Sequence, residues 1–344
     1  MKIVITGGGG FIGSFFCQRL LAQGHVLVSY DLAPPTSVLS GVEYIEGDIR
    51  DTKRLSSVFS GSDRVLHLAA AHHDFGIDSE TFETVNVGGA KAICQALNQN
   101  GIKSVCFFSS VAVYGTGKGG CTENDSPVAE SEYGKTKLAA ESVFRQWQSS
   151  TEQAKCLIIR PTVTFGPGNF ANMYTLINQI ARGRYLRVGD GMNLKSLAFV
   201  DNIVDATLDA WDRVQGEAIS LFNYVDKPDL TSGQIADIIY QELQKKPPRI
   251  TIPYPIARLL ALPFDLFIAI TKVNLPISGS RIKKFAQSET MFPANLIREN
   301  GYVQKTSLED GIRSMVRWYM SLSESERKNS ARRIIPTKAV QSRE

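Results

Sequence analysis

A serine, a tyrosine and a lysine in the first half of the chain have types and spacing suited to proton transfer. Tyr133 and Lys137 are four residues apart in the run YGKTK, so on a helix they share one face. An ammonium group beside a phenol favours the phenolate and lowers a pKa that is about 10 in the free side chain. Ser110 follows an apolar, strand-like run and can hydrogen-bond the same substrate oxygen. These residues predict acid and base chemistry at a hydroxyl or carbonyl, with Ser110 and Tyr133 also binding the substrate.

The chain opens on residues that could bind a hydride-carrying cofactor. The run KIVIT is followed by GGGGFIG, in which Gly7, Gly10 and Gly13 are spaced by three. After a strand, the early glycines make a tight turn and let a pyrophosphate approach the backbone, while the last lets helix and strand pack closely. Amide groups at the start of the helix can bind the anion. Gly8 and Gly9 fall at variable positions of this spacing, so we expect both to be replaceable.

A carboxylate stands where such a cofactor would need one. Asp31 ends the run VLVSYD, eighteen residues after Gly13, close to the roughly 20 residues expected for the group that accepts hydrogen bonds from the adenosine ribose. A carboxylate there repels a 2′-phosphate, and no Arg follows it directly. The sequence therefore predicts NAD in preference to NADP.

The elements that must position these residues recur along the chain. Short apolar runs alternate with helix-length segments; the runs are KIVIT, VLVSY, VEYIEGD, RVLHLAA, SVCFFSS and KCLIIRP. Such strands, separated by crossover helices, are typical of a parallel sheet covered on both faces. We predict an α/β fold, a Rossmann-type doubly wound parallel sheet with a smaller C-terminal α/β cap.

The regularity breaks after about residue 165, which suggests a division into domains. We expect an NAD-binding domain with the catalytic residues over 1–165, a mainly substrate-binding cap over 166–320 with segments returning to the first domain, and a basic, flexible tail over 321–344. Within the cap, 172–182 and 231–244 are predicted helices, and SLAFV and AISLFNYV are predicted strands.

Composition excludes several classes of protein. The 344 residues are 43% hydrophobic and 21% charged, as in an ordinary globular protein. The net charge is +4, of which residues 324–344 supply +3 through six Lys or Arg against three Glu, so no nucleic-acid face is expected. The five cysteines are scattered without CxxC spacing, which indicates reduced thiols. Because the start lacks a signal-peptide pattern, the predicted location is cytoplasmic.

Two segments raise further possibilities. The apolar segment 252–272 is interrupted by Arg258, Pro263 and Asp265, and it lacks the ~20 uninterrupted apolar residues of a membrane-spanning helix. We expect a buried helix of the cap, with a face toward a membrane surface or a lipidic substrate as the alternative.

The run His72–Asp74 suggests no metal site, because adjacent histidines in a loop do not readily converge on one ion. Contacts with the substrate and a solvated loop are the two interpretations left open for this run.

Ordered motifs run from residue 1 to about residue 320. They are TGGGGFIG, GDI, HLAA, NVGG, SSVAVYG, YGKTK, RPTVTFGPGN, FVDNIVDA and ENGYVQKTSLEDGIRSMVRWY. With these motifs the chain resembles the extended short-chain dehydrogenase/reductase superfamily, in its NAD-dependent epimerase/dehydratase branch. The resemblance also implies a homodimer formed through helices 80–100 and 131–149.

The resemblance implies roles for individual residues. It assigns the catalytic serine to Ser110 and leaves Ser109 structural. The residues it places around NAD, besides Tyr133 and Lys137, are Gly7, Gly10, Phe11, Ile12, Gly13, Asp31, Asp48, Ile49, Leu68, Ala69, Ala70, Asn86, Pro161 and Val163. For the apolar members of this set, core packing is the alternative. Asn169 would approach the phosphate side of the substrate, and Arg187 and Arg281 could pair with a diphosphate.

The implied reaction is an NAD-dependent epimerisation or ketoreduction of a nucleotide-diphosphate sugar, with Tyr133 as general acid and base. A dehydratase would need a carboxylate pair beside the serine, where Val111 and Ala112 stand. A 3β-hydroxysteroid or other lipidic-alcohol dehydrogenase is the alternative, because an apolar cap suits an apolar ligand. A non-catalytic NAD-sensing protein is a second alternative.

Overall fold

The computed structural model of this chain describes residues 1–35, 37–72, 77–115, 119–214, 219–248, 250–271, 279 and 290–329. The chain divides into two compact units. Unit 1 comprises Met1–Thr162, Val200–Val225 and Pro293–Lys305; unit 2 comprises Val163–Phe199, Asp226–Phe292 and Thr306–Glu344. Two segments from the second half of the chain thus belong to the first unit.

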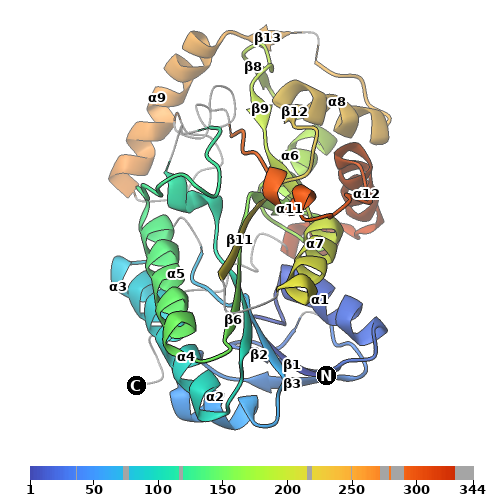
Figure 1. Cartoon of the computed structure of the whole chain (residues 1–344). Coiled ribbons are helices and arrows are strands. Elements are labelled where there is room, and N and C mark those ends of the chain that lie inside the picture. Colours follow the sequence, from blue (N-terminus) through green and yellow to red (C-terminus); the bar gives the residue numbers. More distant parts are fainter. Residues whose placement is uncertain are drawn as a thin grey trace. The chain divides into compact units, whose positions relative to one another are not determined.

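Within the described residues of unit 1, seven strands form one sheet in the order β11-β6-β5-β4-β1-β2-β3 (Figure 1). All neighbouring strands in it are parallel. The strands are β1 (Lys2–Thr6), β2 (Val26–Asp31), β3 (Val42–Glu46), β4 (Arg64–His67), β5 (Ser104–Phe108), β6 (Lys155–Pro161) and β11 (Ile219–Tyr224). The strand order reverses between β1 and β4, and ligands of such sheets bind at the carboxyl ends of the strands near the reversal.

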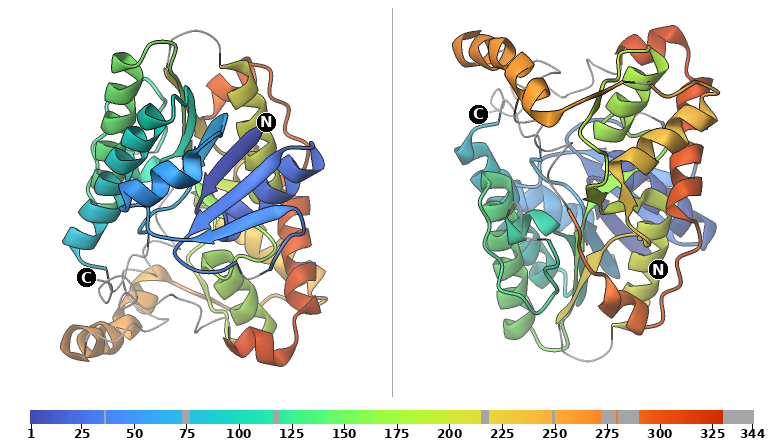
Figure 2. Two further views of the ribbon diagram at one scale, coloured as in Figure 1. Left: turned by 90° about the horizontal axis from the view of Figure 1, so that it is seen from below. Right: turned by 90° about the horizontal axis from the view of Figure 1, so that it is seen from above.

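Helices cover both faces of this sheet. They are α1 (Phe11–Ala22), α2 (Thr52–Phe59), α3 (Ser79–Phe82), α4 (Gly89–Gln99), α5 (Glu132–Ser150), α7 (Val200–Arg213) and α11 (Asn295–Glu299), with a π-helical turn η1 (Glu83–Gly88) and a 3₁₀ turn η2 (Val111–Tyr114). On one face α4 packs between α2 and α5, and on the other α1 packs against α7 (Figure 1, Figure 2). The predicted doubly wound parallel sheet is confirmed.

The strands form where the sequence is most continuously apolar. The segments Ile3–Ile5 of β1 and Leu157–Ile159 of β6 are buried, as strands covered on both faces require. β4 is shorter than its apolar run, because the amides of Leu68 and Ala69 both turn to the Thr6 carbonyl oxygen, at 3.0 and 3.1 Å. This turn ends the strand beside the glycine run that follows β1.

Unit 2 is built from short strand pairs and helices. Its strands pair as β7 (Val163–Phe165) with β10 (Leu197–Phe199), β9 (Leu194–Lys195) with β12 (Leu230–Thr231), and β8 (Arg187–Val188) with β13 (Thr251–Ile252). Its helices include α6 (Asn172–Ala181), α8 (Ser232–Glu242), α9 (Tyr254–Thr271), α12 (Leu308–Ser321) and α13 (Glu324–Asn329). α8 starts at a capping box between Thr231 and Gln234. Both predicted helices, 172–182 and 231–244, are confirmed.

The segment 252–272 contains the expected helix, α9, but the expectation that it is buried is wrong. Most of its large apolar side chains are 40–73% exposed; they are Ile256, Leu259, Leu260, Leu262, Phe264, Leu266, Phe267 and Ile270. A helix that is apolar on all sides is normally buried, but here the buried positions are the small residues Ala257 and Ala261. In the part of the chain that the structure describes, no helix has the length and apolarity to cross a membrane.

Candidate active site

The three residues predicted to transfer protons lie in unit 1, where the segment after β5 meets the start of α5. Ser110 caps η2, and its Oγ accepts a hydrogen bond from the amide of Ala112 at 3.1 Å. Tyr133 and Lys137 lie in the first two turns of α5, which packs against η2. The fold therefore brings this segment of the chain to the carboxyl edge of the sheet.

Gly134, for which no role is predicted from the sequence, allows this close approach. A Cβ at Gly134 would lie 2.5 Å from the carbonyl oxygen of Ala112, so a larger residue would push α5 away from η2. The side chain of Ser131 caps the same turn by accepting a hydrogen bond from the Gly134 amide at 3.0 Å. A glycine inside a helix destabilises the helix by about 1 kcal/mol relative to alanine. A glycine within the predicted helix is therefore the sequence signal that could have pointed to a close contact at Gly134.

Lys137 is buried with its charge directed at aromatic rings. Its Nζ donates to the Phe108 carbonyl oxygen at 2.6 Å, and it lies 4.7 Å from the ring centre of Phe107 and 6.0 Å from that of Tyr133. Burial lowers the pKa of Lys137 to about 7, against the opposing effect of Glu141. The cation thus lies beside the phenol, as the four-residue spacing predicts.

Replacing Lys137 by Met should stabilise the protein in a pH-dependent way. The folded-state pKa of about 7 lies below the ordinary value of 10.5, so the unfolded chain binds more protons between these values. The free-energy cost of burying Lys137 is therefore at its maximum below pH 7. It decreases as the pH rises toward 10.5, the ordinary pKa that applies in the unfolded chain. We expect the gain in unfolding free energy to be about 2–3 kcal/mol larger at pH 6 than at pH 9 in urea titrations.

Lys135→Met is the matched control, because Lys135 lies on the same helix with a side chain 54% exposed. It should change the unfolding free energy equally at both pH values. If Lys137→Met behaves like this control, the depressed pKa is refuted.

A buried ion pair that is not predicted from the sequence joins β6 to α5. Arg160 and Glu141 have side chains 2% and 1% exposed, and Arg160 donates from Nε and Nη2 to the two carboxylate oxygens at 2.8 and 2.6 Å. Arg160 also donates to Tyr114 Oη at 2.7 Å, and the Ser109 hydroxyl donates to Glu141. Because Ser109 precedes the predicted catalytic serine, this cluster fixes the strand end against the helix that carries the tyrosine.

Asn86, predicted to lie near the cofactor, is buried in η1 and hydrogen-bonds two other segments of the chain. Its side-chain oxygen accepts from the Ala71 amide at 2.8 Å, and its amide group donates to the Ala71 carbonyl at 3.1 Å and to Thr136 Oγ1 at 3.0 Å. It thereby joins the segment after β4 to the residue preceding Lys137. A contact between Asn86 and the cofactor stays a prediction.

The glycine turn between β1 and α1 has the geometry predicted for its outer members. Gly7 has φ +75°, and a Cβ there would lie 2.7 Å from the Ala69 amide nitrogen. A Cβ at Gly13 would lie 2.3 Å from the Gly7 carbonyl oxygen. Both glycines are therefore required by the turn itself. Gly10 caps α1, which has no side-chain cap, so the first amides of the helix, at Phe11 and Ile12, face the turn.

The expectation that Gly8 is replaceable is wrong. A Cβ at Gly8 would lie 2.5 Å from Ser29 Oγ, 2.9 Å from Ser29 Cβ and 3.1 Å from the Ile5 carbonyl oxygen, because the turn folds back onto β1 and β2. Gly9 has more room, with Asp31 Oδ2 nearest at 3.2 Å. Of the two variable positions, the structure leaves Gly9 as the more tolerant.

Gly10→Val should fold but fail to bind NAD. Gly10 has φ −75° and ψ 176°, which any residue adopts, and a Cβ there would meet only the Gly7 carbonyl oxygen, at 3.2 Å. We expect a change of a few degrees in Tm, and a loss of at least about 100-fold, near 3 kcal/mol, in NAD affinity by calorimetry.

Two further variants test the register of the glycine turn. Gly13→Val should unfold the protein, whereas Gly9→Ala should largely keep NAD binding. Equal losses in Gly10→Val and Gly9→Ala would show that the assigned register is incorrect.

Asp31 lies directly beside the glycine turn. The Gly9 amide donates to its Oδ2 at 3.1 Å. Burial raises the pKa of Asp31, opposed by hydrogen bonds from the backbone amides of Leu32, Gly9 and Ala33. The carboxylate is therefore held at the end of β2, where the predicted ribose contact requires it.

The two residues predicted to border adenine have different surroundings. Asp48 binds Arg50, whose Nε lies 3.0 Å from both carboxylate oxygens. Burial opposes ionisation of Asp48, but hydrogen bonds from the Arg50 side chain and backbone outweigh it and lower the pKa. Ile49 is 4% exposed and packs against Gly89, so it belongs to the core. Their adenine contacts stay predictions.

The remaining predicted cofactor residues of unit 1 also lie at the carboxyl edge of the sheet. Leu68, Ala69 and Ala70 are half-buried and follow β4, and Ala69 adjoins Gly7. Pro161 is half-buried at the end of β6. Contacts of these residues with the dinucleotide stay predictions.

The other predicted residues lie in unit 2 or outside the described residues. Val163 is 47% exposed on β7, and the Asn169 side chain donates to the Thr164 carbonyl of β7 and accepts from the Ala171 amide. Arg187 forms an ion pair with Asp237, so its guanidinium already has a carboxylate partner. Arg281, and His73 and Asp74 of the His72–Asp74 run, lie outside the described residues.

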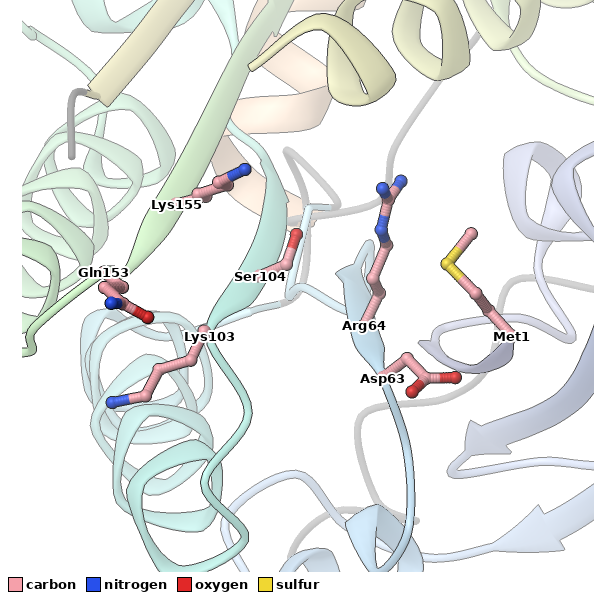
Figure 3. A pocket seen from close by; sticks show the side chains of 7 residues that line it. All are labelled: Met1, Asp63, Arg64, Lys103, Ser104, Gln153 and Lys155. Carbon is pink, nitrogen blue, oxygen red and sulfur yellow. The ribbon is translucent and has the colours of Figure 1, made fainter. Parts of the chain in front are cut away.

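A hollow of about 550 Å³ lies at the opposite edge of the sheet (Figure 3). Its lining residues precede or begin β1, β4, β5 and β6; they are Met1, Asp63, Arg64, Lys103, Ser104, Gln153 and Lys155. Doubly wound sheets bind their ligands at the carboxyl ends of the strands, so this hollow is not the candidate active site.

Comparison with known proteins finds relatives that match most of this chain. The NAD dependent epimerase/dehydratase family matches residues 3–222. The chain is 36% identical over 312 residues to the N-acetyl-alpha-D-glucosaminyl-diphospho-ditrans,octacis-undecaprenol 4-epimerase of Escherichia coli O157:H7, covering 90% of this chain and 93% of that protein. It is 25% identical to isoform 2 of an Arabidopsis thaliana 3beta-hydroxysteroid-dehydrogenase/decarboxylase, covering 91% of this chain and 61% of that protein.

The fold has close counterparts among solved structures. The UDP-glucuronic acid 4-epimerase of Bacillus cereus, in complex with NAD, superposes with a TM-score of 0.74 at 22% identity. The alignment covers 93% of this chain and 99% of that one. At this identity the likeness supports the fold.

Proposed function

This chain belongs to the NAD dependent epimerase/dehydratase family, and from that premise we propose that it is a 4-epimerase of a sugar joined through a diphosphate to a polyprenol. NAD is its cofactor. The residues present fit that dinucleotide: α1 starts without a side-chain cap, Gly10 leaves room in front of that start, and Asp31 stands beside Gly9. The glycine turn and the end of β2 would hold it.

The chain's own residues supply the proton chemistry. Bound NAD would supply the redox chemistry, in which a hydride leaves a sugar carbon and comes back to the opposite face of the same carbon. Tyr133 takes the proton of the hydroxyl on that carbon at its Oη and gives it back to the same oxygen, which makes it both base and acid. Lys137, 6.0 Å from the Tyr133 ring centre, favours the phenolate when charged. Ser110 orients the substrate oxygen by a hydrogen bond.

The substrate class rests on one observation, the similarity to the E. coli epimerase along nearly the whole of both chains. The steroid dehydrogenase alternative has weaker support, because the plant enzyme is less similar and matches over only part of its own length. The second alternative, an NAD sensor without catalytic activity, does not explain the presence of Ser110, Tyr133 and Lys137 at one edge of the sheet.

The test is to incubate the full chain and NAD with N-acetylglucosaminyl-diphospho-polyprenol in detergent, and separately with UDP-N-acetylglucosamine. After mild acid release, chromatography of the sugar should show the 4-epimer from the lipid-linked substrate. Conversion of the UDP-sugar alone would replace the proposal by a nucleotide-sugar epimerase. NADH formation with a 3β-hydroxysteroid, and no epimer from either sugar, would overturn it.

The substrate-binding role of unit 2, the homodimer and the cytoplasmic location stay predictions. The segments expected to form the dimer, 80–100 and 131–149, contain α4 and most of α5. Light scattering of the purified chain measures the assembly directly.

A further inference from the structure

In α9 the small residues face inward and most of the large apolar residues face outward, which is the reverse of an ordinary surface helix. Ala257 and Ala261 are buried, at 5% and 1% exposure, and Asp265 accepts a hydrogen bond from the Gly279 amide at 2.9 Å. These three residues are spaced by four, so they form one inward stripe. The leucine and phenylalanine side chains, with Ile256 and Ile270, point the other way and are exposed.

The exposed apolar surface of α9 is broad. At about 100° per residue, the exposed positions between Ile256 and Ile270 cover an arc of about 200°, roughly twice the stripe of about 100° that a surface helix buries in a protein core. Arg258 is exposed at the edge of this arc, and the one carboxylate of the helix, Asp265, belongs to the inward stripe. Figure 1 shows α9 apart from α6, α8 and α12, and none of the described helices or strands packs extensively against it.

We propose that α9 docks this enzyme on a lipid bilayer, with its apolar arc at the boundary between headgroups and acyl chains and Arg258 among anionic headgroups. A wide apolar face with the basic Arg258 at its margin suits a helix that lies in the plane of a membrane interface. The inference rests on the proposed function, because the polyprenyl chain of such a substrate keeps its sugar at the membrane surface.

Charge favours this occupant over a second copy of the chain. Arg258 is exposed, and no acidic side chain lies among the outward residues of α9. An anionic lipid surface complements that charge, with about 1 kcal/mol gained per basic residue near it. Two copies meeting through α9 would instead bring like charges together.

The area of the outward half of α9 also favours a bilayer over a second copy of the chain. A helix of 18 residues is about 27 Å long and about 10 Å wide, so its outer half offers about 400 Å². A stable protein interface buries about 800 Å² on each partner. A partner helix also covers only a narrow stripe, whereas a fluid hydrocarbon layer can cover the whole arc.

Vesicle flotation tests the proposal without requiring activity. The full chain should float with vesicles of phosphatidylcholine and phosphatidylglycerol. The triple variant Leu259→Gln, Leu266→Gln, Phe267→Gln should lose at least about 100-fold in partition coefficient. Arg258→Gln should lose about fivefold on these vesicles and nothing on pure phosphatidylcholine.

The matched control is the double variant Leu186→Gln, Val303→Gln, which removes apolar side chains 61% and 77% exposed outside α9. It should float as the wild type does. A wild type that stays in solution, or a triple variant that floats normally, overturns the proposal. A triple variant that changes the molecular mass in light scattering while floating normally would instead identify a protein interface.

A failure of membrane docking can be distinguished from a failure of the proposed epimerase reaction. The triple variant should still epimerise a substrate with a short, water-soluble prenyl chain at the wild-type rate. Flotation without any epimerase activity would refute the proposed reaction and support docking. Activity on the short-chain substrate without flotation would refute docking alone.

Discussion

Tyr133→Phe is expected to lower kcat about 10³-fold, or about 4 kcal/mol in the activation barrier, while NAD binding stays unchanged. The substitution removes only the hydroxyl that exchanges the proton. The ring keeps its packing against Phe82, at 6.4 Å between ring centres, and Lys137 keeps an aromatic face opposite its charge. Steady-state rates on the lipid-linked sugar and calorimetric titration with NAD measure the two effects.

Tyr44→Phe is the control for this variant, because Tyr44 lies on β3, at the far edge of the sheet. It should retain wild-type kcat. If Tyr133→Phe keeps more than a tenth of the wild-type rate, Tyr133 is not the main proton donor and acceptor. If it loses NAD binding as well, its role is in binding the cofactor.

Arg160→Leu is expected to lower the free energy of unfolding by about 3–5 kcal/mol in urea titrations, because it leaves Glu141 charged and buried without its partner. Tyr114 loses the donor at 2.7 Å in the same variant. Adding Glu141→Leu should recover most of the loss, since removing both charges avoids the uncompensated burial.

The comparison for Arg160 is a solvent-exposed ion pair. Arg64 pairs with Asp212 at 2.6 Å, and their side chains are 23% and 66% exposed. Arg64→Leu should therefore cost less than about 1 kcal/mol. If Arg160→Leu costs no more than Arg64→Leu, the buried pair does not hold β6 to α5 as described.

What the sequence predicts well here depends on neighbours along the chain. The parallel strands follow from short apolar runs, and the places of Gly7, Gly13 and Asp31 follow from their distance to the end of a strand. The pairing of Tyr133 with Lys137 follows from helical periodicity. In each case the signal lies within one element or at a characteristic distance along the chain from one.

What the sequence could not predict depends on which elements become neighbours. Arg160 and Glu141 meet because β6 and α5 pack together, and nothing local marks either residue as buried. Gly8 is crowded by Ser29, which comes from the adjacent strand. The burial of α9 was wrongly predicted for the same reason, because apolar residues do not reveal which side of a helix the fold covers.

One stripe of α5 carries Tyr133, Lys137 and Glu141, at successive intervals of four residues. The proton donor, its neighbouring cation and the anchor of the buried cluster therefore share one helix face. α5 cannot fray at its start without exposing the catalytic pair, nor loosen further along without breaking the ion pair with Arg160. Thermal inactivation should accordingly coincide with global unfolding, and the backbone amides of α5 around Glu141 should exchange with deuterium as slowly as those of the central strands.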